Sequence, residues 1–168
     1  MNGRRAVTIA PARFLAPASG HPEPPETGEA NAGLDVNVVF TSTDATIVAL
    51  QRASALASRL SARIILVVTQ IVPFPLPLES PPVQAEFNES RLRAIAGAGG
   101  IETIVRAYVC RDWMETLLTV LNSHSLVIVG SRKRWWPTAE ARLARNLRRA
   151  GHEVILTEIQ EASRRPAP

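Results

Sequence analysis

Two short runs of the chain are apolar at nearly every position. Residues 63–69 read R-I-I-L-V-V-T, and residues 126–129 read L-V-I-V. A strand with one face in water alternates apolar and polar side chains, whereas a strand covered on both faces does not alternate. These runs therefore indicate a parallel sheet with helices on both faces, which is an α/β fold.

The segments around these runs show alternating strand and helix patterns. Residues 45–61 contain no Gly or Pro and place four apolar residues on one helical face: Leu50, Ala53, Ala57 and Leu60. We expect further strands at 36–41, 101–109 and 154–159, and further helices at 83–96, after a cap at Asp112, and between a cap at Thr138 and Gly151. The order β-α-β-α-β-α-β-α-β over residues 35–160 predicts a three-layer α/β/α sandwich on a five-stranded parallel sheet, with the half-polar strand 101–109 at an edge.

Proline-rich and polar segments flank and interrupt this pattern. Residues 1–34 are predicted to be a disordered N-terminal tail, and residues 161–168 a polar C-terminal tail. The stretch 73–82 is too rich in proline for a strand or a helix interior. It is either a docking arm that carries Phe74, Leu76 and Leu78, or a rigid connector whose alternate side chains pack on the domain, and we expect the connector.

Composition restricts the class of protein without naming a function. The formal net charge is +4, which is ordinary for one domain, and Lys133 is the only lysine. No apolar run approaches the roughly 20 residues of a membrane span, so we expect no membrane insertion. Cys110 is the single cysteine, which excludes an internal disulfide and suits a cytoplasmic location.

In element order and element lengths, residues 35–160 resemble the universal stress protein family of the adenine-nucleotide α-hydrolase-like superfamily. The resemblance includes the long loop after the second strand, the third strand that leads into R-D-W-M-E at 111–115, and L-V-I-V-G-S-R at 126–132. It implies the Rossmann-like strand order 3-2-1-4-5. On that order, the loops after the first and fourth strands face each other across a crevice, where such sheets bind ligands.

This crevice is the candidate site for a nucleotide or another anion. Its candidate residues follow the first strand, the fourth strand or the start of the last helix: Thr41, Ser42, Asp44, Gly130, Ser131, Arg132, Lys133, Arg134 and Thr138. The cationic run 132–134 beside a helix start could hold an anion, or it could be a solvated turn.

The nucleotide-binding members of the family share the motif G-x-x-G-x9-G-S/T, which this chain matches at one position of four. Gly130 matches the first glycine, whereas Lys133, Leu143 and Ala144 stand at the other three positions. Glycines there let main-chain N–H groups approach phosphates. The resemblance thus implies a degenerate member without ATP as a standard cofactor. Asp44 matches the adenine-contacting Asp of the family only loosely and could instead cap a helix.

Three other features have an ordinary explanation beside a functional one. Trp135 and Trp136 could stack on a base, but we expect packing or an interface. The stripe Arg142, Arg145 and Arg149 could contact nucleic acid, but an exposed helix face is the usual meaning, so we expect no nucleic-acid partner. Cys110 has no histidine at a defensible spacing and is expected to be a buried thiol.

We therefore expect a universal-stress-protein-like module that is not an enzyme, holds no metal and acts in the stress response. It would form a homodimer through the edge strand from Val154 to Ile159, as family members commonly do, or bind a protein partner. The alternative is a nucleotide- or phosphate-binding sensor that uses the loop from Gly130 to Arg134 and a tryptophan stack.

Overall fold

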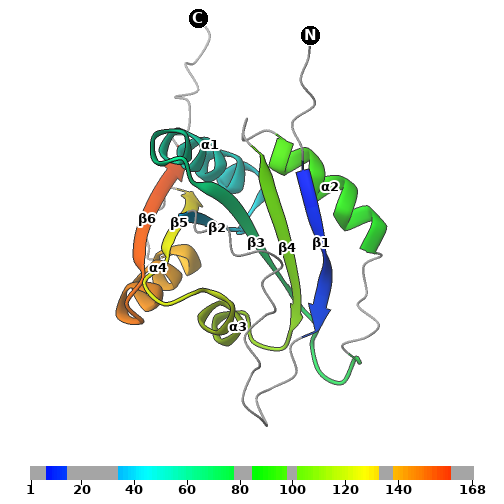
Figure 1. The fold of residues 1–168 in the computed structure, drawn as a ribbon. Coiled ribbons are helices and arrows are strands. Elements are labelled where there is room, and N and C mark those ends of the chain that lie inside the picture. The colour runs from blue at the N-terminus through cyan, green and yellow to red at the C-terminus, as the bar shows by residue number, and fades with distance from the viewer. Residues whose placement is uncertain (1–6, 15–33, 78–84, 98–101, 133–137, 160–168) are drawn as a thin grey trace, which may run out of the picture.

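The computed structural model describes residues 7–14, 34–77, 85–97, 102–132 and 138–159 (Figure 1). In chain order, the elements are β1 (Val7–Phe14), β2 (Asp35–Val39), α1 (Thr43–Leu60), β3 (Arg63–Ile71), α2 (Ala85–Gly97), β4 (Thr103–Cys110), α3 (Trp113–Val120), β5 (Leu126–Arg132), α4 (Ala139–Arg149) and β6 (Glu153–Ile159). The strands form one sheet in the order β1-β4-β3-β2-β5-β6, and every neighbouring pair is parallel.

Five of these strands confirm the predicted sheet. The order β4-β3-β2-β5-β6 is the expected 3-2-1-4-5, and four helices flank it. Side chains of β3 explain the apolar run that predicted it. Ile64 and Leu66 belong to the core under α1 and α2, while Ile65 and Val67 belong to the core under α3 and α4. Both faces of the strand are buried, so no position is left for a polar residue.

The sixth strand differs from the sequence prediction. Residues 7–14, which we had assigned to the tail 1–34, form β1, which pairs with β4 and so takes the edge position predicted for residues 101–109 (Figure 1). Pro11 obscures the strand in the sequence because a proline has no N–H to donate, and its register shifts between Ala10 and Arg13. An edge strand tolerates both features. The other residues of the two predicted tails lie outside the described ranges.

The caps predicted for the last two helices are present. The Asp112 side chain accepts hydrogen bonds from the N–H groups of Met114 and Glu115 at 2.7 and 3.0 Å, and begins α3. The Thr138 hydroxyl accepts from the N–H of Ala141 at 3.2 Å and begins α4. Gly151 follows α4 with a φ of +92°, a conformation that costs glycine little.

An arginine holds the proline-rich segment that follows β3. Arg111 donates to the carbonyl oxygens of Val72 and Leu76, both at 2.7 Å. The Phe74 side chain is nevertheless 88% exposed and Leu76 is 41% exposed. The expectation that alternate side chains of a connector pack on the domain is therefore wrong for these two residues. Leu78 lies outside the described residues.

His152 is buried between α4 and β6 without a complete set of hydrogen bonds. Its side chain is 7% exposed, and its Nδ1 atom has no hydrogen-bond partner among the described residues. Burial lowers the pKa of this imidazole below its ordinary value of 6.5, and His124 lowers it further. The His152 imidazole is therefore protonated less readily in the folded chain than in the unfolded chain.

We predict that the free energy of unfolding decreases as the pH falls below about 6.5. His152 is then protonated in the unfolded chain, whereas its lowered pKa keeps it neutral in the folded chain. Replacing His152 with Gln should weaken this pH dependence. Denaturant unfolding of both proteins at a series of pH values measures it. His21→Gln, which removes a histidine outside the described residues, should keep the wild-type profile, and an unchanged profile for His152→Gln would contradict the assignment.

Candidate functional site

The loops after β2 and β5 lie side by side at the carboxyl edge of the sheet. The two strands pair directly, from Val36 opposite Leu126 to Val39 opposite Val129. The chain leaves β2 toward β3 on one side, whereas β5 and β6 lie on the other side. The crevice between two such loops is where parallel sheets bind ligands. The structure therefore brings together the predicted residues of the two loops that lie in the described ranges: Thr41, Ser42, Asp44, Gly130, Ser131 and Arg132.

At Gly130, the first turn of α1 lies directly against β5. A Cβ atom added to Gly130 would overlap the carbonyl oxygen and carbon of Ala45, in the first turn of α1. The φ angle of Gly130 does not require glycine, since Gly151 is the one described glycine with a positive φ. Gly130 is therefore needed here for the space that it leaves to the helix.

A hydroxyl joins the same two loops. Thr41 Oγ1 donates to the carbonyl oxygen of Gly130 at 2.9 Å, and the Thr41 N–H donates to Thr46 Oγ1 at 3.3 Å. Thr46 is fully buried in α1. Thr41 thus fixes the loop after β2 to both β5 and α1, and its hydroxyl is already engaged.

The two charged candidates pair with each other across the crevice. Arg132 Nη2 lies 3.0 Å from Asp44 Oδ2, with the two side chains 54% and 67% exposed. Asp44 lies in the first turn of α1 and Ser42 is the N-cap residue, so Asp44 is not the cap. An exposed pair of this kind contributes about 0–1 kcal/mol. It occupies the Asp44 carboxylate without holding the loops together.

The remaining candidates separate into three groups. Ser131 is buried at 4% exposure, and its hydroxyl donates to the Arg132 carbonyl at 3.2 Å. Ser42 precedes α1 and makes no side-chain cap bond, whereas Thr138 caps α4. Lys133 and Arg134, like Trp135 and Trp136, lie outside the described residues.

The two last positions of the family motif lie inside α4. Leu143 and Ala144 are both 0% exposed and belong to the core that α4 forms with β5 and β6. They follow the first turn of the helix, so their N–H groups are used by helical hydrogen bonds. Neither residue presents an atom to the crevice.

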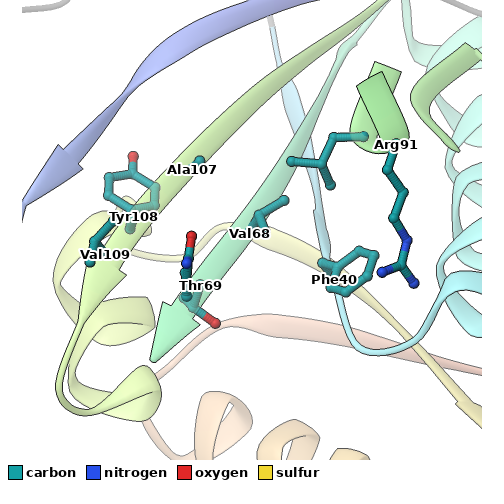
Figure 2. Close-up of a pocket in the computed structure, with 9 residues that line it drawn as sticks. Phe40, Val68, Thr69, Arg91, Ala107, Tyr108 and Val109 are labelled. Atoms are coloured by element: carbon teal, nitrogen blue, oxygen red, sulfur yellow. The ribbon is translucent and has the colours of Figure 1, made fainter. Parts of the chain in front are cut away.

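A cavity that the sequence did not reveal lies on the α2 side of the sheet. Its volume is about 220 Å³, and its walls come from the carboxyl halves of β3 and β4, from α2 and from Phe40 (Figure 2). Ordinary strand residues such as Val68 and Ala107 form it, and they carry no motif. Among the described residues of the lining, Arg91 is the one with a cationic side chain.

Universal stress proteins are among the solved structures with a similar arrangement. The structure of one from Archaeoglobus fulgidus superimposes with a TM-score of 0.53 at 17% identity, over 73% of this chain and 92% of that chain. A universal stress protein in complex with cAMP gives 0.51 at 20% identity, over 75% and 97%. A family protein from Burkholderia pseudomallei gives 0.49 at 20% identity, over 76% and 98%. No family profile matches the sequence, and no curated protein sequence matches it significantly.

The chain has the universal stress protein fold. At these identities the likeness establishes the fold alone, and the ligand has to be argued from the residues. Among the helices of the described ranges, none has both the length and the apolar character that a bilayer span requires. No group of three or more His, Cys, Asp or Glu residues gathers in those ranges at a metal-binding distance.

In this universal stress protein fold, the candidate residues outside the crevice are a buried cysteine and exposed arginines of α4. Cys110 is 1% exposed, and burial raises the pKa of its thiol, with Asp112 adding to the rise and the Thr116 hydroxyl opposing it. Arg142, Arg145 and Arg149 are exposed on α4. Their neighbour Arg148 donates to the carbonyl oxygen of Val154 at 2.8 Å and so ties α4 to β6.

We predict that Gly130→Ala lowers the free energy of unfolding by about 1–3 kcal/mol, because α1 must move away from β5 to admit a methyl group. Gly97→Ala is the matched control. Nothing lies within 4 Å of a Cβ at Gly97, the last residue of α2, so its stability should be equal or slightly higher. Denaturant unfolding compares the two, and equal stabilities would show that α1 does not need Gly130.

Proposed function

We propose that this chain is a universal-stress-protein-like module that works without catalysis and without seating ATP in the standard way. It acts in the stress response by pairing with a second copy of itself or with another protein. The start of α4 supports the proposal that ATP is not bound in the standard way. The two edges of the sheet support the proposal that the chain pairs with a second copy.

Two main-chain N–H groups at the start of α4 are already engaged. The N–H of Ala141 donates to the Thr138 hydroxyl, and the N–H of Arg142 donates to the Thr138 carbonyl at 3.1 Å. Leu143 and Ala144, at the motif positions that favour glycine and a hydroxyl, are core residues. A phosphate cradle needs free main-chain N–H groups and little side-chain bulk. This arrangement therefore supports a module that does not hold ATP as nucleotide-binding family members do.

The two edges of the sheet differ in their capacity to pair. β1 contains Pro11 and a register shift, and both features oppose pairing with a further strand. β6 has neither Pro nor Gly, and it is covered on its faces by α1 and α4 while its outer edge has no partner strand in the described sheet (Figure 1). An open edge of this kind supports a homodimer in which two β6 strands pair.

A cytoplasmic, non-enzymatic role is consistent with the chemistry of Cys110. Burial raises the pKa of its thiol, so the thiolate that a nucleophile requires is scarce at neutral pH. The only cysteine of the chain is thereby kept as a packing residue, as a reducing compartment permits.

We predict that the full chain is a dimer in light scattering coupled to size exclusion, with a monomer appearing on dilution. Thr157→Pro and Glu158→Pro test the role of β6. Because N–H groups alternate in direction along a strand, one proline removes a hydrogen bond to β5 and the other removes an outward N–H.

The variant that keeps wild-type thermal stability should lose the dimer. A strict monomer for the wild-type chain at high concentration would contradict homodimer formation. A dimer that persists in the stable proline variant would place the interface elsewhere.

The second candidate is a nucleotide- or phosphate-binding sensor. One solved structure with this fold is a universal stress protein in complex with cAMP, and Arg132 lies exposed at the crevice of this chain. Lys133, Arg134 and the two tryptophans would complete such a site. Tryptophan fluorescence titrated with ATP, AMP and cAMP tests it. We predict no saturable change at millimolar nucleotide, and a saturable change would favour the sensor over the module.

A further inference from the structure

The cavity on the α2 side is separate from the crevice between β2 and β5. Val68 and Ala107 lie opposite each other in the register of β3 and β4, and α2 contributes Leu92 above them. Phe40, just after β2, closes the side nearest to α1. Figure 2 shows Phe40 and Arg91 on one side of Val68, with Thr69 and Tyr108 farther along β3 and β4; the Tyr108 side chain belongs to the core on the opposite face of the sheet.

The size and walls of the cavity suit one apolar group. An apolar cavity of about 150 Å³ holds a benzene ring, and this one measures about 220 Å³. Most of its lining is hydrocarbon from Phe40, Val68, Leu92, Ala107 and Val109. The described lining also includes four polar residues, Thr69, Gln70, Arg91 and Tyr108, of which Arg91 is the charged one.

Arg91 places one positive charge at the cavity. Its side chain is exposed and extends from α2 toward the start of α1, where Nη2 donates to Thr43 Oγ1 at 2.6 Å. The ion pairs found among side chains in the described ranges join Arg63 to Asp35 and Arg132 to Asp44, and neither involves Arg91. A guanidinium has five N–H donors, so the bond to Thr43 leaves others for a ligand.

We propose that this cavity binds a small monocarboxylate whose apolar part is about one aromatic ring in size. The ring would lie between Phe40, Leu92 and the floor formed by Val68 and Ala107, and the carboxylate would accept hydrogen bonds from Arg91. One fixed cation matches a single negative charge, whereas a phosphate monoester carries nearly two charges and would need further donors. The proposal goes beyond the proposed function, because pairing through β6 does not involve this cavity.

The probe for this site is 3-phenylpropanoate, with 3-phenylpropan-1-ol as its uncharged counterpart. We expect the carboxylate to shift the methyl NMR signals of Val68, Leu92 and Ala107 in the full chain, with saturation below millimolar concentration. The alcohol should shift the same signals with about tenfold weaker affinity, because it cannot form the charged hydrogen bonds to Arg91.

Two variants test the charge and the cavity separately, and a third is the control. Arg91→Gln should weaken 3-phenylpropanoate about tenfold and leave the alcohol unchanged. Arg93→Gln, which removes an exposed arginine from the same helix outside the lining, should bind like wild type. Ala107→Leu should fill the cavity and abolish binding of both probes, and its thermal unfolding shows whether it remains folded.

Absence of any shift at millimolar 3-phenylpropanoate in the folded wild-type chain would overturn the proposal. Equal affinities for the carboxylate and the alcohol would overturn the role of Arg91. Shifts by ATP or cAMP at these methyl groups would instead assign the cavity to a nucleotide. None of these outcomes depends on whether the chain forms a dimer, which light scattering decides separately.

Discussion

The close approach of α1 to β5 at Gly130 is the contact on which the arrangement of the carboxyl edge depends. The first turn of α1 lies on the strand so closely that one methyl group would displace Ala45. Thr41 and Thr46 then fasten the loop after β2 to the strand and to the helix. Because side chains in a packed interior have little free space, this contact fixes how closely the first turn of α1 lies on β5.

The carboxyl edge of the sheet therefore has two different parts, one between β2 and β5 and one at β3 and β4. Between β2 and β5 lie the first turn of α1, the Thr41 hydroxyl and the exposed Asp44–Arg132 pair. Toward β3 and β4, small side chains under α2 leave a cavity of about 220 Å³. The fold of a universal stress protein therefore does not by itself say where a ligand binds in this chain. The residues favour the α2 side for an apolar ligand.

The sequence predicted the strands that are buried on both faces. It did not predict the edge strand β1 or the cavity under α2, which depend on strand pairing and on side-chain volume. Residues 63–69 identified a doubly covered strand because Ile64 and Ile65 are buried on opposite faces. β1 was missed because Pro11 carries the signal of a loop, although an edge strand accepts it. The candidate crevice residues were placed at two adjacent loops, but their contacts could not be foreseen. The cavity was missed because it arises from Ala107 lying opposite Val68 beneath α2, and no local pattern reports that distance.

The ion pair at the crevice is much weaker than the packing of α1 on β5. The exposed Asp44–Arg132 pair is worth at most about 1 kcal/mol and is weakened by salt. Moving α1 off β5 would expose part of a core that includes Ala49, Leu50 and Ile128, each fully buried. Burying a single side chain the size of leucine contributes about 1.5–3 kcal/mol. The position of α1 against β5 therefore depends on helix packing far more than on the Asp44–Arg132 ion pair.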